Sequence, residues 1–258
     1  MHASFAPCRA GAMTPAAFSA LRNRHGERLD AAFHPAAGAR MLAVIAHGIT
    51  SNKDRPYLVE LAESLAASGI AALRFSFAGH GGSEGRFVDA TPGKEVDDLG
   101  CVLGAAAPAG FTRVVCVGHS LGAAVGLLRA ARDPRGSALV SLAGMVHVAR
   151  FMRRHFGRLA PGEPMLGRPD CPWSTALAED AQRLGSLLPQ AATIRIPWLL
   201  VHGTADELVP VEDSRDARAA AGGRPVLVEL PGVDHRFTGA SAELAAVVTP
   251  WIAALEAR

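Results

Sequence analysis

Short apolar runs rich in branched residues alternate along this chain with longer segments in which apolar residues recur every three or four positions. Met41–Ala46 and Arg113–Val117 are runs of the first kind and predict buried strands. Asp54–Ser68, which is followed by Gly69 as a stop signal, is a segment of the second kind and predicts a helix. The same criteria predict further strands at Ile70–Phe77, Ala138–Leu142, Trp198–Val201 and Val226–Leu230, and further helices at Pro92–Ala107, Ser120–Ala131, Val211–Ala221 and Ala242–Leu255.

This alternation predicts an α/β fold with a mostly parallel central sheet and helices on both faces, because parallel neighbours need crossover connections. Nothing in the composition divides the chain, so residues 1–258 are predicted to form one domain. Near the N-terminus, Ala17–Leu21 and Arg28–Phe33 flank a polar turn and are predicted to form an antiparallel edge hairpin. Residues 1–15 are expected to be a flexible extension.

One interval between predicted strands is too long for an ordinary connection. It runs from about residue 145 to 194, about 50 residues, whereas such connections usually have about 2–6. We expect helical segments there, broken by prolines and serving as a lid. The basic run from Arg150 to Arg158 is open to two interpretations, a surface that recognises an acidic substrate or, more commonly, a solvated helix face. The prolines are Pro161, Pro164, Pro169 and Pro172.

Charge and cysteine content narrow the range of partners. The formal net charge of +2 is too small to indicate nucleic acid or an anionic membrane as the main partner. No apolar run approaches the roughly 20 residues of a membrane span, and we recognise no secretory signal. Four scattered cysteines fit a reducing compartment, so a cytoplasmic location is expected. No metal-ligand spacing occurs and no cofactor is expected, while a homo-oligomer remains open.

The segment Gly118-His119-Ser120-Leu121-Gly122 matches the pattern G-x-S-x-G. The pattern is weak alone, but here it follows a predicted strand and opens a predicted helix, which is the setting of a nucleophile elbow. Such a turn forces the serine into a strained conformation and exposes its hydroxyl beside the N–H groups of a helix N-terminus. Ser120 is therefore the candidate nucleophile, and the alternative is an ordinary helix N-cap.

A serine nucleophile needs a base and a carboxylate that orients the base. In this type of fold, the acid follows the serine along the chain, and the histidine follows the acid. Among the later histidines, only His235 follows the last predicted strand. Asp206 follows the strand Trp198–Val201 and is therefore expected at the same sheet edge. We predict that His235 is the base and Asp206 the acid. Glu207 and Asp234 are rival acids, and His202 is interpreted as a structural histidine.

In these segments, the sequence resembles the serine α/β-hydrolases. The resemblance rests on GHSLG around Ser120, HGTADELVP around Asp206 and GVDHRF around His235. Two further stretches, AHGITSNK from Ala46 and FSFAGHGGSEG from Phe75, are similar to segments of the feruloyl (cinnamoyl) esterase-like branch. The resemblance covers about residues 20–255.

The resemblance implies further features of the site. The backbone N–H groups of Ile49 and Leu121 would form an oxyanion hole, and a lid would follow the strand Ala138–Leu142. In the second stretch, Ser76 and Ala78 replace the Asp and Arg of that branch, so a charge pair that braces this loop is missing.

These observations predict a carboxylesterase-type serine hydrolase that cleaves a small-molecule ester through an acyl-enzyme intermediate. A peptidase or a thioesterase with the same three residues is the first alternative, because one scaffold supports all of these reactions. A non-catalytic binding module on the same fold is the second. The divergent lid leaves the preference for cinnamoyl esters open.

Overall fold

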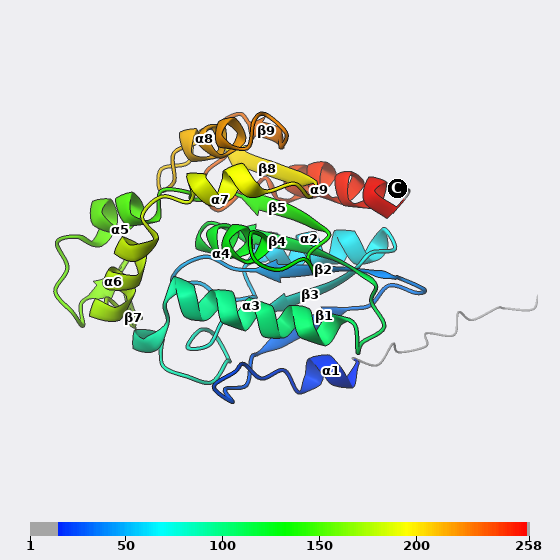
Figure 1. The fold of residues 1–258 in the computed structure, drawn as a ribbon, viewed down its shortest axis with the longest axis horizontal. Helices are drawn as coiled ribbons and strands as arrows, with labels where there is room; N and C mark the ends of the chain where they lie inside the picture. Colours follow the sequence, from blue (N-terminus) through cyan, green and yellow to red (C-terminus); the bar gives the residue numbers. More distant parts are fainter. Residues whose placement is uncertain (1–14, 257–258) are drawn as a thin grey trace, which may run out of the picture.

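The computed structural model describes residues 15–256, so the predicted extension 1–15 lies outside the described residues except for Pro15. A seven-stranded sheet with the order β1-β3-β2-β4-β5-β8-β9 forms the centre of the molecule (Figure 1). All neighbouring strands are parallel except β1 and β3, which are antiparallel. The strands are β1 Ala31–His34, β2 Met41–Ala46, β3 Ala71–Phe75, β4 Arg113–His119, β5 Ala138–Leu142, β8 Trp198–Gly203 and β9 Val226–Leu230.

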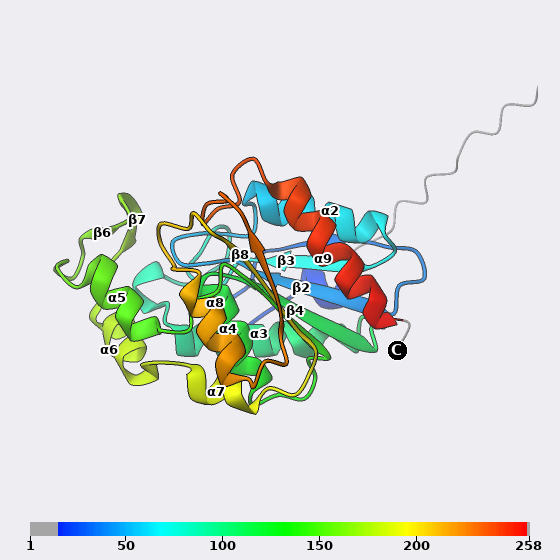
Figure 2. The same cartoon turned by 90° about the horizontal axis from the view of Figure 1, so that it is seen from above.

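Helices cover both faces of this sheet (Figure 2). Alternate residues of each strand point to opposite faces, so that Leu42 and Val44 of β2 belong to one apolar cluster and Ala43 and Ile45 to the other. The helices on the first face are α1 Ala16–Ser19, α3 Pro92–Ala106, α4 Leu121–Ala130 and α8 Glu212–Ala220, and those on the second are α2 Pro56–Ala67 and α9 Ser241–Glu256.

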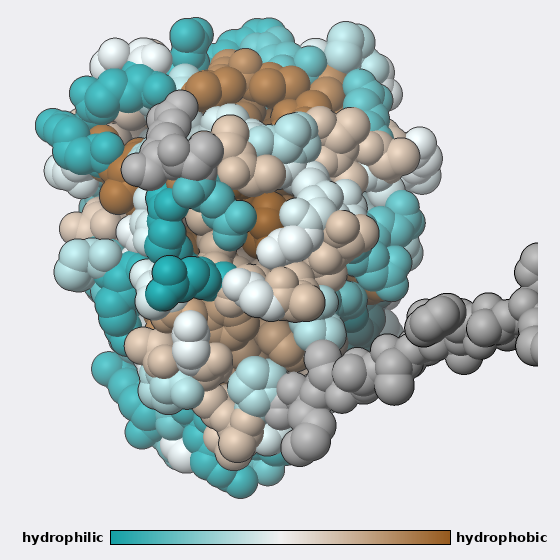
Figure 3. Space-filling view, turned by 90° about the vertical axis from the view of Figure 1, so that its right-hand side faces the viewer, coloured by the Kyte–Doolittle hydropathy of each residue, from teal (hydrophilic) through white to brown (hydrophobic). Residues whose placement is uncertain are grey.

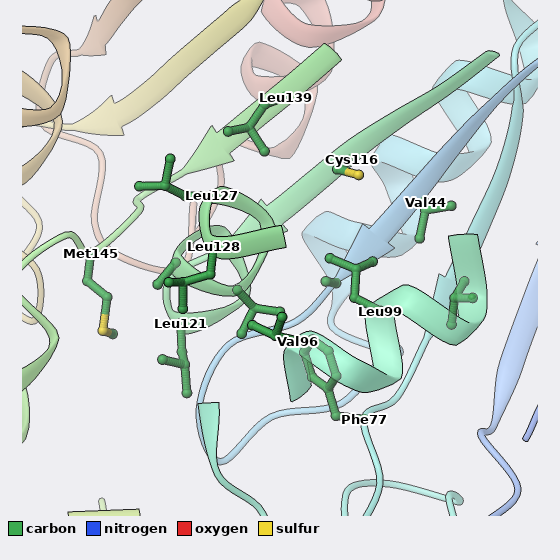
Figure 4. Close-up of a cluster of buried hydrophobic side chains, with 14 of the residues drawn as sticks. Val44, Phe77, Val96, Leu99, Cys116, Leu121, Leu127, Leu128, Leu139 and Met145 are labelled. Carbon is green, nitrogen blue, oxygen red and sulfur yellow. The ribbon is translucent and has the colours of Figure 1, made fainter. Parts of the chain in front are cut away.

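The core between the sheet and α3 and α4 is built from aliphatic side chains. Figure 4 shows Val44 and Cys116 of the sheet facing Leu99 of α3 and Leu127 and Leu128 of α4. All five side chains are buried. This packing fixes the position of the N-terminus of α4, the place where the serine motif lies. The predicted α/β fold, with helices on both faces of a mostly parallel sheet, is thereby confirmed.

The predicted N-terminal hairpin is wrong. Ala17–Leu21 forms no strand, because α1 turns this segment so that the buried Phe18 packs on Phe33 and Phe111 at ring-centroid distances of 5.3 and 6.0 Å. The strand β1 pairs with β3 instead, where it covers an open sheet edge. Of the expected pairing, the described residues keep a bridge between Arg22 and Arg28 and a hydrogen bond from the Leu29 N–H to the Leu21 carbonyl at 2.9 Å.

The long interval between β5 and β8 forms an insertion, residues 143–197. Its part up to residue 184 lies beyond the end of the sheet in Figure 1, whereas the helix Leu188–Thr193 packs against α8 and α4. The insertion is less helical than expected, because three of the four prolines lie in strands of a small antiparallel hairpin. Its elements are α5 Val148–Phe156, β6 Pro164–Met165, β7 Arg168–Pro172, α6 Thr175–Leu184 and α7 Leu188–Thr193, and a 3-10 turn, Phe87–Asp89, lies against it.

At the opposite end of the sheet, the surface mixes hydrophilic and hydrophobic residues (Figure 3). Within residues 15–256, no helix combines the length and the apolar character that crossing a membrane requires.

Candidate functional site

Four loops at the carboxyl ends of the strands carry the residues predicted for the site. Ile49 follows β2, Ser120 follows β4, Asp206 follows β8, and His235 follows β9. Because the carboxyl ends of parallel strands meet at one sheet edge, residues far apart in sequence lie together there. Ser120, Ile49 and His235 line one cavity of about 50 Å³, and Asp206 contacts His235 from behind it.

Ser120 occupies a strained turn between β4 and α4. Its φ of 56° and ψ of −116° lie outside the regions that residues with a side chain ordinarily adopt. The turn is tight, since a Cβ atom on Gly122 would come within 2.4 Å of the His47 carbonyl oxygen. The Ser120 N–H donates to the Leu142 carbonyl at 2.9 Å. Its hydroxyl is buried, and within residues 15–256 it has no hydrogen-bond partner.

Asp206 and His235 form a short hydrogen bond. His235 Nδ1 lies 2.7 Å from Asp206 Oδ2, so this nitrogen carries the proton and Nε2 is left as a base. Burial opposes ionisation of Asp206, but hydrogen bonds from His202 and His235 outweigh it and hold the pKa of this carboxyl well below its usual range. The rival acids lie elsewhere: Glu207 is exposed, and Asp234 accepts from two N–H groups of its own turn.

His202 is a second histidine on the same carboxylate. Its side chain is fully buried, and Nε2 lies 3.1 Å from Asp206 Oδ2 and 3.0 Å from the Val209 carbonyl oxygen. Both neighbours accept, so Nε2 donates, while Nδ1 accepts from the Ser214 hydroxyl at 2.7 Å. His202 therefore orients the carboxylate that orients His235. The sequence indicated its burial but not this contact.

A second pair of residues, Tyr57 and His119, supports His235 from the other side. His119 Nε2 donates to the backbone carbonyl of His235 at 2.9 Å, and its Nδ1 accepts from the Tyr57 hydroxyl at 3.0 Å. Burial lowers the pKa of His119 to about 3, which keeps this ring neutral. Both rings pack near Phe237. Sequence reasoning missed this pair, although His119 lies inside the serine motif.

Replacing Tyr57 with Phe is expected to lower the thermal stability. The change removes the only hydrogen bond that the structure provides to His119 Nδ1 within residues 15–256, and leaves a buried acceptor unpaired. Such a loss costs about 1–2 kcal/mol, which corresponds to a melting temperature lower by roughly 2–8 °C for a domain of this size. Calorimetry measures it, with Glu63→Gln on the exposed face of α2 as the control. A Tyr57→Phe protein as stable as the control contradicts the assigned bond.

The loop after β2 approaches the serine turn closely. A Cβ atom on Gly48 would lie 2.9 Å from Ser120 Cβ. His47 holds this loop, because its Nδ1 donates to the Gly48 carbonyl at 2.8 Å and its Nε2 accepts from the Phe77 N–H at 3.1 Å. Burial and the neighbouring His80 lower the pKa of His47 well below its ordinary value, so this clamp is neutral. Leu121 is the first residue of α4, a position whose N–H has no partner within the helix.

The loop with the substitutions Ser76 and Ala78 is held by hydrogen bonds at both of these positions, and its Glu84 forms an ion pair with Arg22 at 3.1 Å. The Ser83 hydroxyl donates to the Ser76 carbonyl at 2.7 Å, and the Ala78 N–H donates to Asp98 Oδ2 at 2.9 Å. Neutral hydrogen bonds and a helix carboxylate thus hold the segment that covers His47.

The insertion contributes Phe151 of α5 and Leu166 of the hairpin to the walls of the cavity that Ser120 lines. Within the part of the chain that the structure describes, no group of three or more His, Cys, Asp or Glu side chains is arranged to hold a metal ion. The groups that this edge of the sheet presents include a hydroxyl, an imidazole, a carboxylate and backbone N–H groups.

The sequence matches one protein-family model and a known relative. A family model, Hydrolase_4, with the description serine aminopeptidase S33, matches residues 37–175. A monoacylglycerol lipase from Mycolicibacterium smegmatis is 29% identical to this chain, and the match covers 70% of this chain and 75% of the lipase.

Solved structures of esterases superpose well on this one. Est1E from Butyrivibrio proteoclasticus, with bound ferulic acid, has a TM-score of 0.83 at 24% identity and covers 92% of this chain and 99% of its own. The esterase domain of a Rhodothermus marinus protein has a TM-score of 0.72 at 24% identity, with coverages of 90% and 95%. These superpositions confirm the α/β-hydrolase fold that the sequence motifs indicated.

Proposed function

This chain belongs to the Hydrolase_4 (serine aminopeptidase S33) family as an esterase-like α/β-hydrolase, and from that premise we propose that it cleaves small-molecule carboxylic esters with Ser120, His235 and Asp206 as its triad. One observation carries the proposal. His235, whose Nδ1 is bonded to Asp206, lines the same cavity as Ser120, a residue with a strained backbone whose hydroxyl has no hydrogen-bond partner among the described residues. The proposed base and nucleophile thus line one small space, and within residues 15–256 the structure has no hydrogen bond between them.

In the first half of the reaction, the Ser120 oxygen attacks the ester carbonyl carbon while His235 Nε2 takes the hydroxyl proton. The carbonyl oxygen becomes an oxyanion, which accepts from the N–H groups of Ile49 and Leu121. The bond to the alcohol oxygen then breaks, and the proton on Nε2 passes to that leaving oxygen. The products are a free alcohol and an acyl group on Ser120.

Water completes the cycle. His235 Nε2 takes a proton from a water molecule, which attacks the acyl carbonyl. The second tetrahedral intermediate then expels the Ser120 oxygen, which takes the proton back from Nε2, and the free acid leaves. Asp206 stays ionised throughout and stabilises the imidazolium. The insertion 143–197 acts as a lid in this proposal, because Phe151 and Leu166 help to enclose the reacting bond.

A panel of substrates with matched acyl groups tests the proposed reaction. We expect turnover of p-nitrophenyl acetate and butyrate that exceeds turnover of the corresponding thioesters and of aminoacyl p-nitroanilides. Faster turnover of thioesters or aminoacyl amides would assign the site to another reaction. The absence of turnover together with failure to react with a fluorophosphonate would favour a binding module.

The family description makes an aminopeptidase the second candidate. An aminopeptidase must bind the α-ammonium group of its substrate, and a carboxylate near the nucleophile is the natural partner for that cation. Among the described residues that line the Ser120 cavity, none is Asp or Glu, and two are arginines, Arg55 and Arg236. This charge pattern disfavours a cationic substrate and therefore an aminopeptidase.

Replacing Gly48 with Ala is expected to lower kcat by about 10²-fold with little change in KM. The added Cβ would lie 2.9 Å from Ser120 Cβ and 3.1 Å from His119 Nδ1, so the loop must move and carry the Ile49 N–H away from the oxyanion. Displacements of this order cost about 10²-fold in rate. Steady-state kinetics on p-nitrophenyl butyrate measure the effect.

Gly104→Ala in α3 is the matched control, because its added Cβ would meet only the flexible end of Arg135, at 3.2 Å. We expect this control to keep full activity. A folded Gly48→Ala protein with kcat within twofold of the unsubstituted enzyme would contradict the proposed oxyanion loop.

A further inference from the structure

The charge around the Ser120 cavity is one-sided. Of the described residues that line it, Arg55 and Arg236 carry a positive charge and none carries a negative one. Within residues 15–256, no carboxylate lies within ion-pair distance of either guanidinium, although the chain forms many ion pairs elsewhere, such as Arg150 with Asp213 at 2.6 Å. Two unpaired arginines beside a nucleophile are a suitable site for an anion.

Arg55 is held in place without a counter-charge. Its Nε donates to the Ser51 hydroxyl at 2.8 Å, and its Nη2 donates to the Thr50 carbonyl at 3.3 Å. These bonds use two of the five guanidinium N–H groups. The half-buried side chain is thus ordered by the loop that carries Ile49, with donors left for a ligand.

Arg236 directly follows His235 in a tight turn. Its backbone N–H donates to Asp234 Oδ1 at 3.0 Å, which orders the main chain, while its side chain is exposed. Arg55 and Arg236 both act electrostatically on the phenol of Tyr57, although burial dominates and raises the pKa of Tyr57 well above its usual range. The two cations therefore flank one side chain of the catalytic cavity.

A larger cavity adjoins the catalytic one on this side. It has a volume of about 430 Å³, and Arg55, Tyr57 and Arg236 line both spaces. The volume lies within the range of small-molecule sites, roughly 300–1,000 Å³. Glu60 is the single carboxylate that lines it among the described residues, so the lining remains net positive.

A different cavity, of about 300 Å³, adjoins the catalytic one under the insertion and shares Phe151 and Leu208 with it. Two arginines also line this space, Arg154 and Arg150, and Arg150 is ion-paired with Asp213. An ester has two arms on either side of its carbonyl carbon. The two adjoining cavities match that shape. In the cavity under the insertion, Glu212 and Asp213 balance Arg150 and Arg154, whereas the lining of the cavity beside Tyr57 is net positive.

We propose that this enzyme selects esters that carry a carboxylate or another anionic group on one arm, and that Arg55 and Arg236 bind this anion in the cavity beside Tyr57. The inference rests on the proposed esterase function and specifies its substrate class. Charge-assisted hydrogen bonds from two arginines predict a preference of about tenfold or more in kcat/KM over a neutral isostere.

Matched pairs of esters test the preference on each arm. Methyl hydrogen succinate against methyl succinamate varies the acyl arm, and 4-acetoxybenzoate against 4-acetoxybenzamide varies the alcohol arm. For one pair, we expect the anionic member to be preferred about tenfold or more. We expect the ratio to fall to about twofold or less in Arg55→Gln and in Arg236→Gln, and to shrink in 0.5 M salt because of screening. The ratio within one variant cancels any general loss of activity.

Arg153→Gln is the matched control, because Arg153 is an exposed arginine of α5 that lines none of the three cavities. We expect it to keep both the activity and the preference. Turnover that depends on Ser120 but shows no anionic preference on either arm overturns this inference and leaves the esterase proposal standing.

A binding measurement separates the two proposals further. Calorimetry compares Ser120→Ala with the double variant Ser120→Ala, Arg236→Gln. We expect the double variant to bind 4-acetoxybenzoate or methyl hydrogen succinate about tenfold more weakly. Equal affinity in the single and double variants overturns the anion site, whatever the outcome of the hydrolysis assays.

Discussion

Replacing Ser120 with Ala is expected to lower kcat on p-nitrophenyl butyrate by a factor on the order of 10⁶, the loss found when the nucleophile of a serine hydrolase is removed. Without the hydroxyl there is no acyl-enzyme, and the remaining catalysis comes from substrate binding and the oxyanion N–H groups. The fold should not weaken, because the hydroxyl has no hydrogen-bond partner to lose within residues 15–256. Steady-state kinetics and a melting curve measure the two effects.

Ser19→Ala, which changes an exposed serine in α1, is the control and should keep full activity. Ester turnover by Ser120→Ala within about tenfold of the unsubstituted enzyme would remove Ser120 from the reaction. A large loss of both activity and stability would instead indicate a structural role for the hydroxyl.

Replacing Asp206 with Asn is expected to lower kcat by about 10⁴-fold, the loss found when the orienting carboxylate of another serine hydrolase is replaced. Asp206 Oδ1 accepts from the N–H groups of Leu208 and Val209, and Oδ2 accepts from His235 and His202. An amide nitrogen in place of Oδ2 would face two N–H donors. His235 would then adopt the other tautomer and lose its basic Nε2 toward Ser120.

Glu207→Gln is the matched control, since Glu207 is the exposed neighbour that sequence reasoning left as a rival acid. It should retain full activity. A loss in Glu207→Gln comparable with that in Asp206→Asn would contradict the assignment of the acid.

Asp206→Asn should also change the dependence of stability on pH. The pKa of Asp206 is lowered in the folded state, so its ionised form stabilises the fold above the unfolded pKa, and this contribution disappears as the pH falls through the folded value. Asp206→Asn should therefore be less stable than the unsubstituted protein near neutral pH, with a difference that narrows in acid. Denaturant titrations at several pH values measure it, and a constant difference would contradict the depressed pKa.

The sequence predicted the positions of these residues because their order carries geometric information. The serine lies between a strand and a helix, and the aspartate and the histidine each follow a later strand. Residues at these places lie at one edge of a parallel sheet, independent of the detailed loop conformations. The strand Ala138–Leu142 and the strand Val226–Leu230 were predicted with the bounds that the structure has. Ala138–Leu142 is buried throughout and mostly apolar, as is typical of a parallel strand covered on both faces, whereas the edge strand Val226–Leu230 is recognisable from its branched apolar residues.

Features that depend on tertiary contacts were not predictable in this way. The N-terminal segment was assigned to a hairpin, but the packing of Phe18 on Phe33 and Phe111 overrides that local pattern. Tyr57 reads as an ordinary apolar position of a helix, and only the structure brings its hydroxyl to His119. Arg55 and Arg236 are 181 positions apart in the sequence, and only the fold places both of them in the lining of the cavity with Tyr57.

Covalent labelling tests the central claim most directly. The folded protein is incubated with a fluorophosphonate, digested, and the modified residue is located by mass spectrometry of the peptides. The account predicts one adduct on the Ser120 hydroxyl, its absence in Ser120→Ala, and much slower formation in Asp206→Asn. A folded protein that forms no adduct, or forms it at another residue while Ser120 stays unmodified, would contradict the account.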